Sequence, residues 1–215
     1  MHSIPIRFEI KDNIAHCILS NPPKNEMNGE FFRELSRLCH EVFPTLQVSG
    51  MLVYGKGNHF SSGANLEELR TLYHSSSPSL TASFFYGNHE SFQMIAQLSF
   101  PVVAVINGCC LGAGLELALA CSHRIASNRA VFALPEATFN LIPGCGGTIR
   151  LPKLLSKDKA IELILSGRIV SAEEAILIGL IDACTGKKSL MDKAMSFIHL
   201  KDNGSSTPFE GGNRA

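Results

Sequence analysis

The sequence has no excess of charge of either sign, and this absence excludes one class of partner. Its 215 residues contain 19 Lys or Arg and 19 Asp or Glu, so the formal net charge is zero. Surfaces that bind nucleic acid or anionic membranes need a basic excess. We therefore expect no nucleic-acid partner.

The chain also lacks the residue spacings of common metal sites. Its seven cysteines form no Cys-x-x-Cys pair, and its eight histidines form no His-Glu-x-x-His motif. Most of the cysteines lie within apolar runs, which is typical of buried free thiols in a reducing cytosol. We therefore expect no metal site and a cytoplasmic location.

Features of membrane insertion are missing as well. Residues 1–7 show no charged segment followed by an apolar leader. Residues 101–121 are apolar over the length of a membrane span, but they include Asn107, Glu116 and three glycines. A strand, a turn and a helix explain this stretch better than a span does. We expect no membrane insertion.

The balance of hydrophobic and charged residues indicates a globular chain. Hydrophobic residues make up 45% and charged residues 18%, and a chain of this length commonly forms one domain. Residues 201–215 are mostly polar or glycine, so we expect a core domain at 1–200 followed by a disordered tail.

Hydrophobic periodicity predicts strands and helices that alternate along the chain, which favours an α/β fold. A glycine-rich turn is expected at 107–112 and a mobile loop at 74–79. The expected strands are 6–10, 14–19, 50–54, 101–106, 124–127, 130–133 and 180–184, and the expected helices are 28–42, 66–72, 80–98, 113–121, 147–155, 157–166 and 172–179.

Two glutamates stand out because each lies beside a glycine-rich bend in an apolar stretch. Glu116 follows Gly112-Ala-Gly114, and Glu136 precedes the glycine-rich segment 144–147. A carboxylate is costly to bury unless it is stabilised or its pKa rises. The pair therefore suggests general acid–base chemistry in a dry pocket, although a helix-capping Glu116 and a surface Glu136 are simpler alternatives.

The bends also suggest backbone donors for a developing negative charge. Ala113 lies between two glycines at an expected helix start, where N–H groups are unpaired. Gly63-Ala64 precedes another expected helix and supplies a second candidate N–H, although an ordinary turn is the simpler interpretation of that pair taken alone. If Ala64 and Ala113 converge, they form an oxyanion hole.

The sequence resembles the crotonase superfamily, and most closely the enoyl-CoA hydratases, over about residues 50–185. No single motif is specific, but together they are. They are FSSGANL at 60–66, PVVAVING at 101–108, LGAGLE at 111–116, LPE at 134–136, IPGCGGT at 142–148, LSGR at 165–168 and AEEAILIGL at 172–180.

The resemblance implies a spiral of ββα units with a shortened C-terminal helical region, assembled as a trimer or hexamer. It places the oxyanion hole at the N–H groups of Ala64 and Ala113 and the catalytic acids at Glu116 and Glu136. Gly144 matches a glycine that helps to place the reacting water. Ala64 and Leu66 would contact the coenzyme A part of an acyl-CoA substrate, and no separate cofactor is implied.

The presence of both glutamates favours hydration of a 2-enoyl-CoA. Relatives that retain only the second glutamate are often isomerases, so a Δ3–Δ2 enoyl-CoA isomerase is the nearest alternative. Only residues 187–200 match part of the usual C-terminal helices, which leaves a non-catalytic acyl-CoA-binding or interaction subunit as another alternative.

Overall fold

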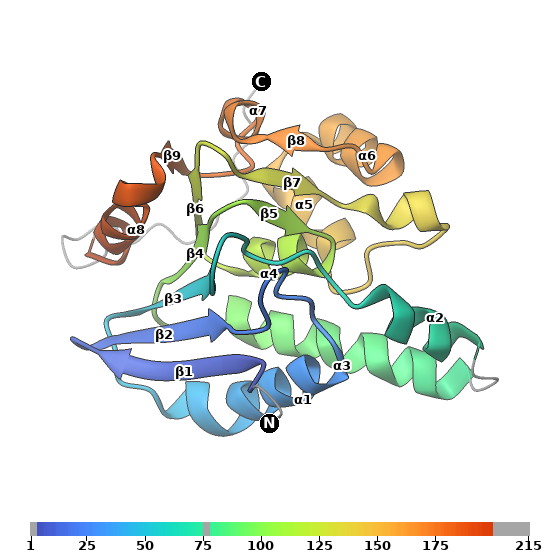
Figure 1. Ribbon diagram of the computed structural model, residues 1–215, viewed down its shortest axis with the longest axis horizontal. Coiled ribbons are helices and arrows are strands. Elements are labelled where there is room, and N and C mark those ends of the chain that lie inside the picture. The colour runs from blue at the N-terminus through green and yellow to red at the C-terminus, as the bar shows by residue number, and fades with distance from the viewer. Residues whose placement is uncertain (1–3, 75–77, 200–215) are drawn as a thin grey trace.

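The computed structural model describes residues 4–74 and 78–199, and a six-stranded sheet runs through them (Figure 1). All pairs are parallel except the N-terminal hairpin β1–β2. The strand order is β1 (Ile6–Lys11), β2 (Ile14–Leu19), β3 (Gly50–Gly55), β4 (Val102–Ile106), β6 (His123–Ser127) and β9 (Ala183–Thr185).

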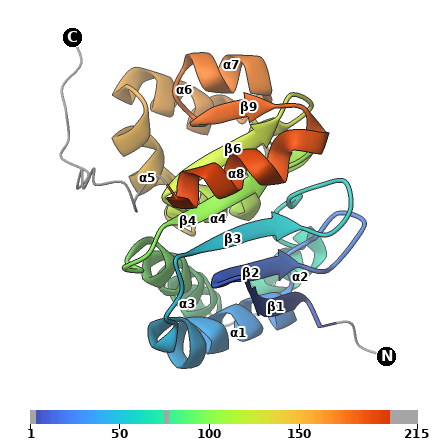
Figure 2. The same cartoon turned by 90° about the vertical axis from the view of Figure 1, so that its left-hand side faces the viewer.

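The central strands are apolar on both faces because both faces are covered. All five residues of β4 are buried, as is usual for a parallel strand between two layers. The last described helix, α8 (Leu190–His199), covers one face with Leu190, Ala194 and Ile198 (Figure 2). α8 packs closely on β3 because Gly50 lacks a side chain there: a Cβ at this position would lie 2.7 Å from Ile198 Cγ2.

The other face carries the helices that surround the site. Asn28 caps α1 by accepting a 2.9 Å hydrogen bond from Phe31 N, as its sequence position predicts. A π-helical turn at Leu38–Val42 continues α1. The helices on this face are α1 (Gly29–Arg37), α3 (Pro78–Ala96) and α4 (Ala113–Ala120), with α2 (Leu66–His74) beside α3.

A second, three-stranded sheet holds the glycine-rich bends in place. It consists of β5 (Cys109–Leu111), β7 (Val131–Ala133) and β8 (Val170–Ser171). The expected turn at 107–112 was therefore wrong in part, because residues 109–111 pair with β7 across the sheet. This long-range pairing overrides the local turn signal of the glycines.

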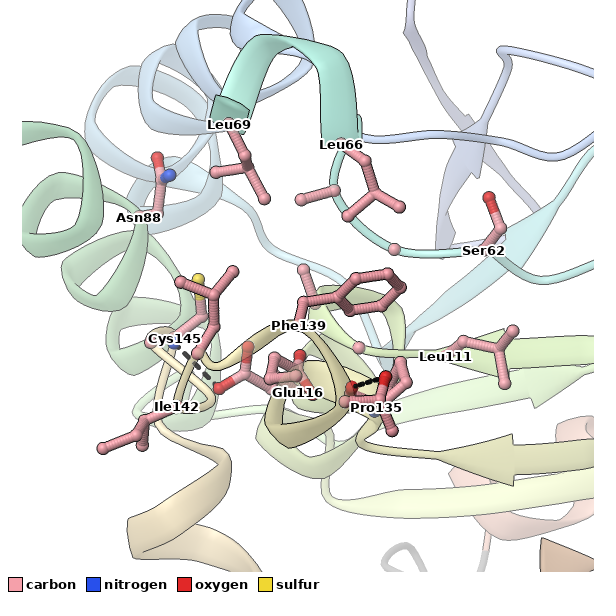
Figure 3. Close-up of a pocket in the computed structure, with 18 of the residues that line it drawn as sticks. Ser62, Leu66, Leu69, Asn88, Leu111, Glu116, Pro135, Phe139, Ile142 and Cys145 are labelled. Carbon is pink, nitrogen blue, oxygen red and sulfur yellow. Dashed lines mark hydrogen bonds between the residues drawn. The ribbon is translucent and has the colours of Figure 1, made fainter. Parts of the chain in front are cut away.

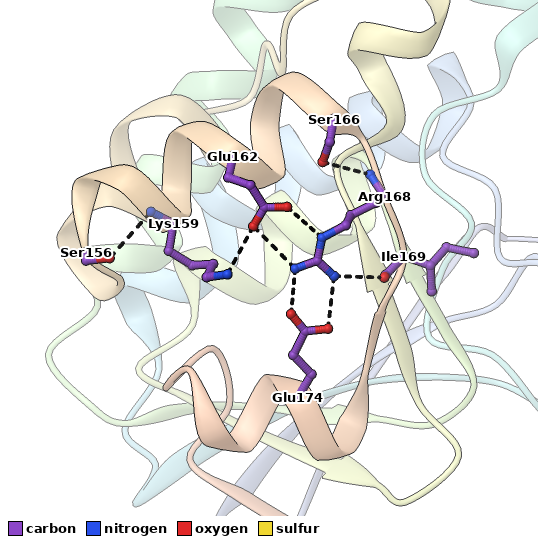
Figure 4. Close-up of polar contacts among 7 residues, drawn as sticks. All are labelled: Ser156, Lys159, Glu162, Ser166, Arg168, Ile169 and Glu174. Atoms are coloured by element: carbon purple, nitrogen blue, oxygen red, sulfur yellow. Dashed lines mark hydrogen bonds and ion pairs between the residues drawn. The ribbon is translucent and has the colours of Figure 1, made fainter.

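Four further helices follow β7 along the described chain before β9 begins. They are the 3₁₀ helix at Pro135–Phe139, α5 (Gly147–Leu154), α6 (Lys157–Ser166) and α7 (Ala172–Leu177). Arg168 links α6 to α7, since its Nε donates to Glu162 Oε1 at 2.6 Å and its Nη1 to Glu174 Oε2 at 2.9 Å (Figure 4). Gly167, next to it, packs against the 3₁₀ helix.

The expected α/β class is confirmed, with most expected elements within two residues of their predicted bounds. The closing strand begins at Ala183 rather than residue 180, and β8 was missed. Of the expected loop 74–79, His74 ends α2 and Pro78 begins α3. Residues 75–77 and the expected tail 201–215 lie outside the described residues.

Candidate active site

A cavity of about 330 Å³ lies between α2, α3 and the segments that follow β5 and β7 (Figure 3). Its wall is mostly apolar, with few polar side chains, as is usual for small-molecule sites. It is lined by Phe32, Ser62, Gly63, Ala64, Leu66, Leu69, Asn88, Leu111, Gly112, Ala113, Glu116, Pro135, Glu136, Thr138, Phe139, Leu141, Ile142, Gly144 and Cys145.

The two glycine bends meet at this cavity. Gly63 has φ +94°, and a Cβ at that position would lie 3.5 Å from Ala113 N. Gly112 has φ +51° and forms the N-cap of α4, so Ala113 is the first helical residue. Within the described part of the chain, neither Ala64 N nor Ala113 N donates a hydrogen bond. Two free N–H groups on adjoining bends therefore border one cavity.

Glu116 lies on α4, a helix buried along its whole length, and is only 2% exposed. Its Oε1 accepts hydrogen bonds of 2.8 Å from both Cys145 N and Gly147 N. A Cβ on Gly147 would lie 3.1 Å from this oxygen, so the missing side chain allows the close approach. The carboxyl group is thus fixed in position by a loop some thirty residues further along the chain.

Glu136 lies in the 3₁₀ helix that follows β7. Its Oε1 is near Gly112, since a Cβ there would lie 3.0 Å from that oxygen. Its Oε2 is buried and has no hydrogen-bond partner among the described residues. Burying a carboxyl oxygen without a hydrogen-bond partner costs free energy. A ligand or a water molecule that donates to this atom would offset that cost.

The two carboxyl groups differ in how far their surroundings stabilise the ionised form. Burial raises the pKa of Glu116, while the N–H groups of Gly147 and Cys145 and the charge of Arg150 oppose that rise. Burial, with the charge of Glu116, raises the pKa of Glu136 from 4.5 to about 7. The backbone donors favour the ionised form of Glu116, whereas Glu136 Oε2 has no such partner among the described residues.

A second hollow of about 600 Å³ adjoins the cavity and is more polar. Ala64 and Leu66 line both spaces, as does Ser62. The second hollow adds Lys24 and His59, together with Glu26, Asn65, Glu67 and Cys109. A long ligand could therefore extend from one space into the other past Ala64. No cluster of three or more metal-ligating side chains occurs among the described residues.

Comparisons with known proteins agree with this arrangement. Residues 9–207 match the family model described as enoyl-CoA hydratase/isomerase. The chain belongs to the enoyl-CoA hydratase/isomerase family, within the crotonase superfamily. Its function is therefore enoyl-CoA hydratase/isomerase-like at the level of the family.

Similar proteins include both separate enzymes and parts of larger ones. A Bacillus subtilis protein named "Probable enoyl-CoA hydratase" is 35% identical over 82% of this chain and 67% of its own length. The fatty acid oxidation complex subunit alpha of Vibrio campbellii is 35% identical over 87% of this chain but 27% of its own length. The chain thus spans only about a quarter of that larger relative.

Solved structures confirm the crotonase fold for this family member. The enoyl-CoA hydratase of Bacillus anthracis superimposes with a TM-score of 0.84 at 30% identity, covering 93% of this chain and 77% of that one. The enoyl-CoA hydratase of Thermoplasma volcanium GSS1 gives 0.83 at 30% identity, covering 91% and 77%. None of the helices in the described residues has the length and apolar character of a membrane span.

All the predicted site residues of this family member line the cavity, including Gly144. Three features of the site were not predicted: the Cys145 and Gly147 donors to Glu116, and the buried Asn88 in the cavity wall. The Gly-rich pattern at 144–147 was the one available signal for the donors. Burial raises the pKa of the Cys145 thiol, which keeps it protonated.

Proposed function

We propose that the protein is an enoyl-CoA hydratase, which reversibly adds water to a 2-enoyl-CoA thioester to give a 3-hydroxyacyl-CoA. One observation carries the proposal: two carboxyl groups with raised pKa values face a cavity that two unpaired backbone N–H groups also border. The pair supplies a base and an acid, and the N–H groups supply an oxyanion hole.

The thioester carbonyl oxygen would accept hydrogen bonds from Ala64 N and Ala113 N. As water adds to C3, electron density moves onto that oxygen, and preorganised donors stabilise it without reorganisation. Free N–H groups at the start of α4 are suited to this task because the helix N-terminus carries partial positive charge.

The two acids would divide the proton transfers. Glu116, held in its ionised form by Cys145 N and Gly147 N, would accept a proton from the attacking water. Glu136, with a pKa of about 7, would deliver a proton to C2. Dehydration follows the same path in reverse, and Gly144, which also lines the cavity, would help to place the water.

The coenzyme A part of the substrate would extend into the second hollow. Ala64 and Leu66 lie where the two spaces join. The one lysine among the described residues that line the hollow, Lys24, pairs with Glu26 Oε1 at 3.5 Å. Coenzyme A enters as part of the substrate, and the proposal requires no other cofactor. The homotrimeric or hexameric assembly stays a prediction from the resemblance, and the cytoplasmic location stays a prediction from the cysteine pattern.

Activity is expected to fall as the pH rises through about 7. Hydration needs one proton on the glutamate pair, held by Glu136, whose pKa is raised to about 7, so deprotonation removes the acid. Dehydration also starts from a glutamate pair that carries one proton. With rising pH, kcat/KM should therefore fall for dehydration as it does for hydration. The measurement is kcat/KM against pH, which reports the ionisation of the free enzyme. A value that stays constant or rises as the pH passes through 7 would count against this assignment.

The activity itself is tested by following water addition to crotonyl-CoA and to longer or branched 2-enoyl-CoA thioesters. We expect the double-bond absorbance to fall as 3-hydroxyacyl-CoA forms. No turnover on the whole panel, combined with measurable thioester binding, would instead favour a non-catalytic acyl-CoA-binding subunit.

An isomerase is the second candidate, and one observation favours it. Glu136 Oε2 has no partner among the described residues, so a single acid could shuttle a proton between C2 and C4. Replacing Glu116 with Ala separates the two functions. A hydratase should lose at least about 10²-fold in kcat because its base is gone, whereas an isomerase should keep most of its activity on a 3-enoyl-CoA.

A further inference from the structure

The cavity contains a polar side chain that the proposed chemistry does not use. Asn88 lies on α3 and is 6% exposed, and its amide Nδ2 is buried without a hydrogen-bond partner among the described residues. Asn88 lines the same cavity as Glu116 and Glu136. An unpartnered buried amide costs free energy unless something else satisfies it.

The surroundings of Asn88 are otherwise apolar. Figure 3 shows Asn88 on the α3 side of the cavity, beside Leu69 of α2 and across the cavity from Ser62. Apolar neighbours offer the amide no alternative partner, so a bound molecule would provide the missing hydrogen bond. The χ2 torsion of asparagine is soft, and a small rotation would turn the N–H toward an oxygen in the cavity.

Asn88 lies away from the end of the cavity where coenzyme A would enter. The second hollow joins the cavity at Ser62, Ala64 and Leu66, and Asn88 does not line it. The loop that holds Glu116 is tied to α3 at Gln93, since Arg150 Nη1 donates to Cys145 O at 2.8 Å and its Nη2 to Gln93 Oε1 at 3.0 Å. Asn88 would therefore line the acyl part of the site, away from the coenzyme A end.

We propose that Asn88 determines acyl-chain specificity by donating a hydrogen bond to an oxygen on the acyl tail, so that the site selects oxygen-bearing acyl thioesters over plain hydrocarbon ones. The inference rests on the proposed function, because it takes the cavity as the acyl site. A site that hydrogen-bonds a substrate oxygen rejects the analogue that lacks it, because the protein group is then left buried and unpaired.

The test measures binding, so that it does not depend on turnover. Saturated acyl-CoA thioesters of one chain length are compared with matched ketones, the ketone being moved one carbon at a time along the tail. We expect the parent protein to bind the best-placed ketone at least about tenfold more tightly than the plain chain. The variant Asn88→Leu, similar in size but apolar, should lose this preference and bind the plain chain at least as well as the parent.

Ser91→Ala is the matched control. Ser91 is a buried polar residue on the same helix, but its Oγ donates to Gly87 O at 3.1 Å and it does not line the cavity. The ketone preference should survive in this variant. Equal binding of ketone and plain chain by the parent, or a preference that persists in Asn88→Leu, would overturn the inference.

Parallel hydration assays separate the two proposals. A binding preference without any hydration would remove the hydratase proposal and keep the role of Asn88. Hydration of matched 2-enoyl thioesters with no binding preference for the ketone would remove the role of Asn88 and keep the hydratase proposal. Failure to bind any acyl-CoA would overturn both.

Discussion

Replacing Glu136 with Gln is expected to lower kcat for hydration by about 10²–10⁴-fold, the range typical of a general acid or base. The amide has nearly the same shape as the acid but cannot transfer the proton. Glu136 Oε2 has no partner among the described residues, and glutamine keeps an oxygen that can accept a hydrogen bond, so the fold should be retained. Steady-state kinetics on crotonyl-CoA, or on the best thioester of the panel, gives the measurement.

Stability provides the control for this variant. A carboxyl group whose pKa is raised from 4.5 to about 7 binds more protons in the native state than in the unfolded state between those values. The free energy of unfolding therefore decreases as the pH rises through that window. A neutral Gln avoids this loss, so the variant should melt at least as high as the parent at pH 8. A variant with parental kcat would refute the role of Glu136.

Glu173→Gln is a suitable comparison for the same charge change. Glu173 is exposed on α7 and lines neither of the two hollows. Its replacement should leave kcat within about twofold of the parent value, as is usual for surface substitutions away from special features. A comparable loss in both variants would point to a general effect of net charge rather than to Glu136.

The features that the sequence predicted are those with a local signal. Glycines that permit unusual backbone angles lie next to Ala64 and Ala113 in the sequence, so the two N–H groups could be identified from the order of residues alone. Glu116 and Glu136 stood out because burying a carboxylate in an apolar run costs free energy unless something stabilises it. The hairpin and the Asn28 cap were likewise encoded within a few residues.

The features that the sequence could not predict depend on contacts between distant segments. The donors to Glu116 come from residues 29 and 31 positions away, and nothing near Glu116 indicates them. β5 forms only because residues 109–111 pair with β7. Asn88 looks like an ordinary polar residue in a helix, and its importance appears only once its burial in the cavity wall is known.

The second large effect is expected from Ala113→Pro, which removes one N–H of the oxyanion hole. Losing one such donor typically costs about 10²–10³ in kcat. Proline is well tolerated at the first position of a helix, where its missing N–H has no intrahelical partner, and Ala113 occupies that position in α4. The preceding residue is Gly112, with φ +51° and ψ −128°, so no side chain there meets the proline ring.

Ala113→Gly is the control, since it keeps the N–H and removes only a methyl group. We expect it to retain activity within about tenfold of the parent, with a small loss of helix stability. Kinetics and thermal unfolding are measured for both variants. If Ala113→Pro folds and hydrates at the parental rate, Ala113 N does not contact the developing charge. If it folds but loses kcat while the glycine variant keeps it, the N–H itself and not the side chain supports catalysis, and the unpaired donor at the start of α4 has its explanation.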